Sequence, residues 1–177
     1  MSEATKAHGV PMLRDGTFNR LRVSISRQEM VATHDSAIAE ERFRISTAKN
    51  GVGQESGSEC TPLGSHRIRA KIGANAPTGS VFVGRRLTGE VYTEVLAEQH
   101  PGRDWILTRI MWLCGNETGL NRLGSVDTQR RYIYIHGCPD SHELGKPSSH
   151  GCIKMYNKDI ERLFDLVEIG CHVDIEI

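Results

Sequence analysis

Short stretches of alternating apolar and polar residues are the feature that most constrains how this chain folds. They lie at residues 20–25, 42–46, 67–72 and 171–177. In the first of them, Leu21, Val23 and Ile25 alternate with arginine and serine. A period of two places the apolar side chains on one face of an extended chain, which is the pattern of a strand with one buried face. The sequence therefore predicts a mainly β (α+β) fold.

Two further segments are predicted to be strands, although they do not alternate in this way. Residues 105–113 are apolar on both faces except for Thr108 and Arg109, which is typical of a central strand. Residues 132–135 are rich in side chains that favour strands, and they end directly on His136. This histidine is thus predicted to close a strand.

One helix is predicted, over residues 157–169. Its apolar stripe has the spacing i, i+3, i+4, i+7 and consists of Ile160, Leu163, Phe164 and Val167. We expect Asn157 to cap the start of this helix and Gly170 to end it. A weaker helical pattern covers residues 29–41.

The length and charge of the chain limit its class. A chain of 177 residues fits a single domain, and we expect an N-terminal extension over residues 1–19 and one domain over residues 20–177. Basic and acidic residues number 22 each, so the chain lacks the basic excess that is usual in nucleic-acid-binding proteins. Only 6% of the residues are aromatic, which argues against a surface for stacking bases.

The sequence also bears on location. The longest apolar run is residues 110–114, whereas a membrane span needs about 20 residues, so no span is expected. Residues 1–20 lack the apolar stretch of a secretory signal, and we expect a cytoplasmic protein, or a periplasmic one if the N-terminus is truncated. The five cysteines are scattered and odd in number, which favours reduced thiols.

The most informative window is residues 136–152, which holds three of the eight histidines and two of the five cysteines. A cysteine attacks as a thiolate, and a neighbouring imidazole can take its proton. We interpret His136 and Cys152 as such a pair, with the backbone N–H groups of Gly151 and Cys152 holding a developing oxyanion. The window thus predicts an acyl-transfer site.

Two other interpretations of this window remain open. In the first, His136 and Cys138 bind a metal ion together with one of His142, His150 and Cys152. The spacing of these residues matches no common zinc module, and no CxxC pair is present. In the second, the residues are ordinary polar side chains of a loop. Cys138 is either a resolving thiol for Cys152 or, more simply, a loop residue without a role.

The same window resembles the catalytic signature of L,D-transpeptidases, the YkuD-type domain. The signature has a strand ending in His-Gly, here His136-Gly137. A variable loop follows, and then a second motif, here Ser149-His150-Gly151-Cys152-Ile153-Lys154-Met155. Upstream, residues 58–64 are similar to the family's loop that leads into Thr-Pro-x-Gly before a strand. The resemblance covers roughly residues 20–177. It implies a β-sheet or sandwich core with one C-terminal helix.

The resemblance also implies roles for individual residues. Cys152 would be the nucleophile and His136 its general base, with the carbonyl group of Gly137 orienting the imidazole. Ser149, His150, Gly151 and Lys154 would line the acyl or oxyanion site, and no metal or cofactor is expected. Family members commonly have arginine where this chain has Lys154, and a lysine offers a point charge in place of a planar fork.

The implied substrate is a peptidoglycan stem peptide or muropeptide. Cys152 would attack the bond between an L-configured centre and a terminal D-alanine. We favour water as the acceptor, as in a cytoplasmic L,D-carboxypeptidase that trims a tetrapeptide to a tripeptide in muropeptide recycling. One alternative is an L,D-transpeptidase that transfers the acyl group to an amine, by cross-linking or D-amino acid exchange. Another is a non-catalytic or metal-structured binding module, and a third is redox chemistry between Cys138 and Cys152. The oligomeric state stays open.

Overall fold

The computed structural model describes residues 18–35 and 40–177, and it confirms the mainly β fold. The strands are β1 (Phe18–Ser24), β2 (Glu29–Thr33), β3 (Glu40–Arg44), β4 (Gly64–Ile72), β5 (Ser80–Val83), β6 (Arg86–Val91), β7 (Ile106–Gly115), β8 (Tyr134–Cys138), β9 (Ile153–Tyr156) and β10 (Val167–Glu176). The helices are α1 (Glu94–Gln99) and α2 (Asn157–Leu166), with a short 3-10 turn at Gly124–Val126. No helix among these residues is long and apolar enough to cross a membrane.

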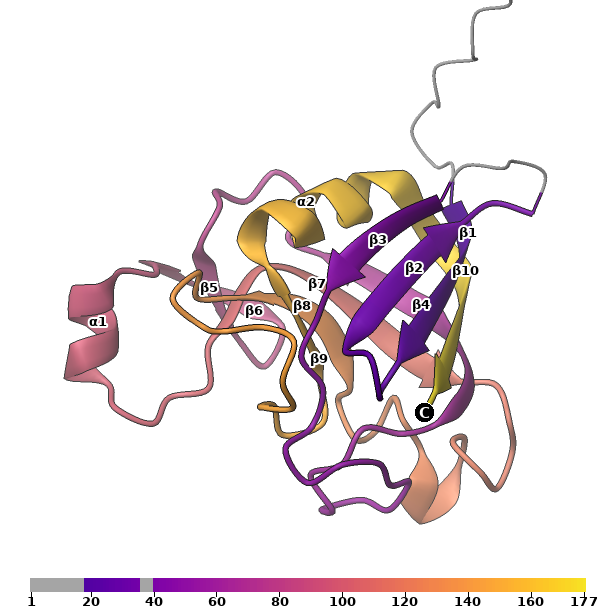
Figure 1. Ribbon diagram of the computed structural model, residues 1–177. Helices are drawn as coiled ribbons and strands as arrows, with labels where there is room; N and C mark the ends of the chain where they lie inside the picture. Colours follow the sequence, from indigo (N-terminus) through magenta and orange to yellow (C-terminus); the bar gives the residue numbers. More distant parts are fainter. Residues whose placement is uncertain (1–17, 36–39) are drawn as a thin grey trace, which may run out of the picture.

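All ten strands belong to one curled sheet (Figure 1). Its main order is β3-β2-β1-β10-β4-β7-β5-β6, and β8 and β9 continue from β7 as a branch. Strand β7 therefore pairs with β4, β5 and β8, which confirms the prediction of a central strand over residues 105–113. Two pairs, β1 with β10 and β8 with β9, are parallel.

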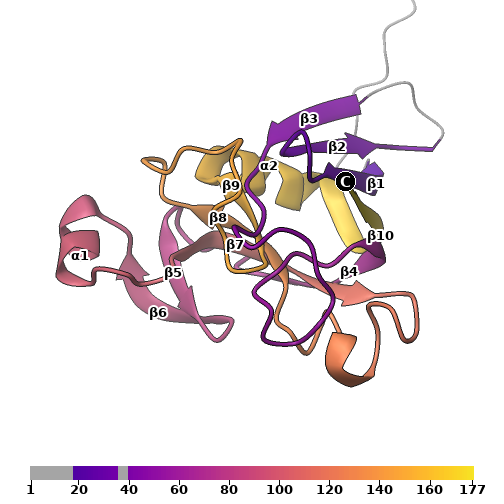
Figure 2. The same ribbon diagram turned by 60° about the horizontal axis from the view of Figure 1, so that its bottom comes forward.

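The sheet nearly closes on itself. Beyond β3, the backbone N–H of Ser46 donates to the carbonyl oxygen of Lys154, and the N–H of Lys154 donates back to Ser46. This bridge joins the end of the β1–β3 meander to β9, at the far end of the branch. Helix α2 lies across the curled sheet, whereas α1 projects from its side (Figures 1 and 2).

The main core lies between α2 and the inner face of the sheet. The predicted helical stripe is buried there, and Ile160, Leu163 and Val167 have no exposed surface. The strands contribute their alternating apolar residues to the same cluster, for example Leu21 and Val23 of β1. Burying this apolar surface is the dominant favourable contribution to folding.

The predicted C-terminal end of the helix over residues 157–169 is wrong. Helix α2 stops at Leu166, and Val167 already opens β10. Gly170 lies inside β10 with a φ of 95°, where the pairing with β1 shifts its register. Its positive φ therefore fits the irregularity in β10, and Gly170 does not end α2. Asn157 is the first helical residue and makes no cap, because its side chain bonds to neighbouring segments instead.

Two other local predictions also need correction, those for residues 29–41 and for the end of the strand at His136. The weak helical pattern over residues 29–41 is wrong, since this stretch forms β2 and the start of β3, and residues 36–39 lie outside the described residues. Helix α1 was not predicted, and β8 runs past His136 to Cys138. Of the expected extension, residues 1–17 lie outside the described part of the chain, and β1 begins at Phe18.

A buried polar network fixes α2 against β7. Thr108 has a φ of 72°, in the left-handed region, at a bulge where the β7–β8 register shifts. Its hydroxyl donates to Asn157 Oδ1 at 2.5 Å and accepts the N–H of Gly79 at 2.9 Å. Asn157 Nδ2 donates to a carboxylate oxygen of Asp140 at 3.3 Å. The side chain of Asn157 thus connects α2 to β7 and to the loop after β8.

Replacing Asn157 by alanine tests this network. We expect Asn157→Ala to lower the free energy of unfolding by about 1–3 kcal/mol, because the buried hydroxyl of Thr108 loses its acceptor. Chemical denaturation measures the change. The exposed neighbour Lys158 provides a control, since Lys158→Ala should change stability by less than about 0.5 kcal/mol. Equal effects of the two substitutions would contradict the network.

Candidate active site

The parallel pairing of β8 with β9 builds the site. Ile135 lies opposite Ile153 and His136 lies opposite Lys154. Because side chains alternate along a strand, the isoleucines enter the core while His136 and Lys154 face the other way. Cys152, directly before β9, faces the same side. Together with Ser149 and His150, these three line one cavity of about 480 Å³.

The thiol of Cys152 lies at the wall of this cavity. Its sulfur accepts the backbone N–H of Tyr134 at 3.3 Å and lies 3.5 Å from the carbonyl oxygen of Tyr132. Burial raises the pKa of the Cys152 thiol to about 12. The thiol is therefore protonated at neutral pH, and a base must take its proton when the sulfur attacks.

His136 has the geometry of such a base. Its Nδ1 lies 2.8 Å from the carbonyl oxygen of Gly137, so this nitrogen carries the proton in the neutral ring. Its Nε2 is buried and has no hydrogen-bond partner among the described residues. Burial lowers the pKa of His136 most, while the Gly137 carbonyl and Asp104 raise it and Lys154 lowers it further. The imidazole is therefore neutral at neutral pH and able to accept a proton.

Gly137 leaves no room for a side chain. A Cβ at this position would lie 2.7 Å from Asn157 Oδ1 and 2.7 Å from the carbonyl oxygen of Leu107. Any other residue would therefore displace β8 from β7 and α2, together with the carbonyl group that meets His136.

The loop before Cys152 is held by two hydroxyl groups. Ser149 Oγ donates to the carbonyl oxygen of Cys152 at 2.5 Å and accepts the N–H of Gly151 at 3.2 Å. Thr61, from the upstream motif, donates to the carbonyl oxygen of Gly151 at 2.9 Å. Gly151 has a φ of 127°, which favours glycine. Its N–H donates to Ser149 Oγ, and its role as a donor to the oxyanion stays a prediction.

The other expected lining residues differ in burial. Lys154 is 6% exposed, and its Nζ donates to the carbonyl oxygen of Ser148 at 3.3 Å. His150 is exposed at the mouth of the cavity, where its Nδ1 lies 3.9 Å from a carboxylate oxygen of Asp104. The cavity thus has an enclosed cation beside His136 and a polar, accessible rim.

Several cavity residues were not assigned to the site by sequence reasoning. They are Gly84, Arg85, Asp104, Ile106, Tyr132 and Tyr134. The period-two pattern of the strand before His136 was sufficient to place Tyr134 on the same face. Arg85 and Asp104 come from the β5–β6 turn and the segment before β7, and no local pattern links these to residues 136–152.

The structure does not form the alternative arrangements. Cys138 is the last residue of β8 and fully buried, so the interpretation as a loop residue is wrong. Burial raises the pKa of its thiol to about 12, and all five cysteines are free. Within residues 18–35 and 40–177, no three side chains of His, Cys, Asp or Glu gather as metal ligands would.

The chain is similar to known proteins in both sequence and fold. The YkuD family, described as the L,D-transpeptidase catalytic domain, matches residues 19–175. A Fuscovulum blasticum protein, described as a candidate L,D-transpeptidase of the ATP synthase subunits region (ORF 5), is 32% identical over 123 residues, which is 63% of this chain and 59% of that protein.

Solved structures share the fold at low identity. An L,D-transpeptidase from Mycobacterium smegmatis has a TM-score of 0.52 at 17% identity, over 89% of this chain and 58% of that one. An L,D-transpeptidase mutant from Enterococcus faecium has a TM-score of 0.52 at 17% identity, over 90% of this chain and 50% of that one. The chain spans less than two thirds of each of these proteins. The match over residues 19–175 shows that this chain belongs to the YkuD family of L,D-transpeptidase catalytic domains.

Proposed function

We propose that this chain cleaves the amide bond between an L-configured centre and a terminal D-alanine in a peptidoglycan stem peptide. One observation carries the proposal: the buried Nε2 of His136, which has no hydrogen-bond partner in the part of the chain that the structure describes, shares a cavity with the sulfur of Cys152. An unpaired buried nitrogen costs free energy, which is recovered when it accepts a proton from a reacting group.

In the first step, Cys152 Sγ attacks the carbonyl carbon of the L-centre while His136 Nε2 takes the thiol proton. A thioester forms as the C–N bond breaks, and the imidazolium returns the proton to the departing amine of D-alanine. The carbonyl group of Gly137 holds the ring through Nδ1–H in both protonation states. The N–H of Tyr134 donates to the sulfur at 3.3 Å and therefore lies close to the reacting centre.

Water is the proposed acceptor in the second step, and the cytoplasm the proposed compartment. Water would lose a proton to His136 and release the acyl group as a carboxylate, so that a muropeptide tetrapeptide becomes a tripeptide. The exposed, polar rim at Asp104 and His150 supports access of water to the thioester. The alternative is an amine acceptor, which would make the reaction a transpeptidation or an exchange of D-amino acids.

The first prediction concerns the nucleophile. Incubated with a disaccharide-tetrapeptide and a free D-amino acid, the protein should release one alanine, seen by mass spectrometry as a shorter muropeptide. Cys152→Ala should lower this rate at least about 1,000-fold, because no other group in the cavity can form the thioester. Cys60→Ser, which changes a thiol outside this cavity, serves as the control and should retain the activity.

The products distinguish the proposals. A terminal alanine replaced by the added D-amino acid, or a cross-linked dimer, would contradict water as the acceptor and support the amine alternative. Substrate that stays unchanged with the parent protein would contradict both.

The second prediction concerns pH. Because the pKa of His136 is lowered, the acid limb of kcat/KM should lie below the ordinary histidine pKa of 6.5. Lys154→Gln removes a cation that lowers this pKa, so the acid limb should move to higher pH. Asp104→Asn removes an anion that raises it, so the limb should move to lower pH. A pH–rate profile measures each shift.

Lys158→Gln, on the exposed face of α2, is the matched control for charge removal and should leave the profile in place. Shifts of the same sign in the Lys154 and Asp104 variants would rule out His136 as the group that titrates.

A further inference from the structure

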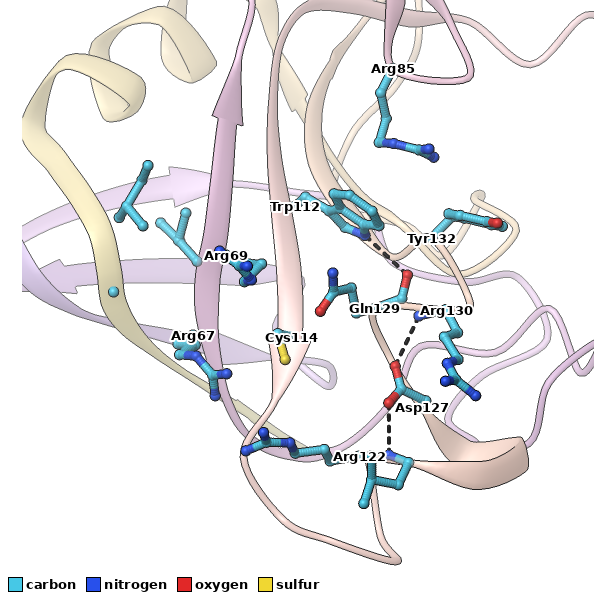
Figure 3. Close-up of a pocket in the computed structure, with 14 residues that line it drawn as sticks. Arg67, Arg69, Arg85, Trp112, Cys114, Arg122, Asp127, Gln129, Arg130 and Tyr132 are labelled. Carbon is cyan, nitrogen blue, oxygen red and sulfur yellow. Dashed lines mark hydrogen bonds between the residues drawn. The ribbon is translucent and has the colours of Figure 1, made fainter.

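A second cavity, of about 720 Å³, lies beside the catalytic one on the outer face of the sheet. Strands β4, β7 and β10 form its floor, and the β5–β6 turn and residues 122–132 form its sides (Figure 3). Both cavities are lined by Arg85 and Tyr132. A ligand can therefore lie across the two without leaving the protein surface.

Five arginines from three separate segments line this second cavity, which we call the arginine groove. They are Arg67, Arg69, Arg85, Arg122 and Arg130 (Figure 3). The first two lie on β4, Arg85 lies in the β5–β6 turn, and the last two lie in the connection between β7 and β8. The fold thus gathers like charges that are far apart in the sequence.

Across residues 18–35 and 40–177, these arginines have no carboxylate partner. Elsewhere the arginines of this chain commonly pair, as Arg103 does with Glu90 and Arg109 with Glu161. Within the described residues, no carboxylate oxygen lies within 4.0 Å of a guanidinium nitrogen of the groove. The groove therefore keeps its positive charge.

Among the described residues that line the groove, Asp127 is the one acid, and backbone N–H groups already bind it. Its oxygens accept the N–H groups of Leu123 and Arg130 at 2.7 and 2.9 Å. Burial opposes ionisation of Asp127, but these donors hold its pKa below the ordinary value. Its charge thus offsets at most one of the five guanidinium charges.

Arg85 marks the junction between the two cavities. Its guanidinium lies 4.4 Å from the ring centre of Trp112 and 4.9 Å from that of Tyr132, and it donates to the hydroxyl of Tyr134 at 2.9 Å. These contacts fix the cation between the groove and Cys152, which packs in the same cluster as Tyr134.

A groove lined by one sign of charge raises the local concentration of ions of the opposite sign. Guanidinium groups suit carboxylates, which they bind through two parallel hydrogen bonds. We propose that the arginine groove binds carboxylates of the acidic peptide whose amide bond is cleaved at Cys152. This inference rests on the proposed function, and it identifies the substrate as a peptide with carboxylates remote from the scissile bond.

The test uses two synthetic tetrapeptide stems. One has its free carboxylates, and in the other every carboxylate except that of the terminal D-alanine is amidated. Arg69→Gln combined with Arg122→Gln should raise KM for the acidic stem on the order of tenfold and leave kcat nearly unchanged. The amidated stem should have a raised KM with the parent protein and respond little to the double variant.

The control is Arg22→Gln combined with Arg27→Gln, which removes the same charge from exposed positions outside the groove. It should leave both KM values within about twofold of the parent. If the Arg69 and Arg122 variant behaves like this control while the parent protein cleaves the acidic stem, the inference is overturned and the proposed function stands.

A binding measurement without turnover distinguishes failure of this inference from failure of the proposed function. The chain has two tryptophans, of which Trp112 lines the groove and Trp105 is 6% exposed elsewhere, so fluorescence reports on the groove. Triglutamate should change the fluorescence of Cys152→Ala, and this change should disappear in the Arg69 and Arg122 variant. A response to pyrophosphate and none to triglutamate would overturn the assignment to carboxylates, whether or not the enzyme is active.

Discussion

The parallel pairing of β8 with β9 is the interaction on which the rest of the site depends. It fixes His136 opposite Lys154 and leaves Cys152 one residue before the paired segment. A slip of one residue would turn the isoleucines toward the cavity and the histidine toward the core. The core therefore enforces the register, because Ile135 and Ile153 have no exposed surface. Packing on one face of these strands positions the chemistry on the other.

Burial then sets the resting state of the site. Partial burial of the Cys152 thiol and full burial of the His136 imidazole favour the neutral form of each group. The pair therefore stores no separated charge before a substrate binds. Lys154 lowers the pKa of His136 and Asp104 raises it. The neighbouring arginine groove adds positive charge outside the Cys–His pair. The positive charge of the arginine groove and the reacting Cys–His pair thus lie in two adjoining cavities.

Local patterns predicted most strands, the α2 core stripe and the segment that contains the site. These features depend on the period of apolar residues or on short motifs, both of which are visible in one stretch of chain. The errors arose where contacts with segments distant in the sequence determine the local structure. Asn157 bonds to Thr108 and Asp140 and does not cap its helix, and Gly170 meets β1 within a strand. Arg85 reaches the site through the sheet topology, which no local pattern encodes. The catalytic roles of Cys152 and His136 stay predictions.

The position of β10 has a consequence for how the chain is made. This strand lies between β1 and β4, in parallel with the first and antiparallel to the second. It is translated after every other strand of the sheet, yet it joins the β1–β3 meander to the strands that bear the site. Until it emerges from the ribosome, the two parts of the sheet present open edges, which invite pairing with other chains. Folding of this domain is therefore a late event in its synthesis, and the nascent chain depends on protection of those edges until then.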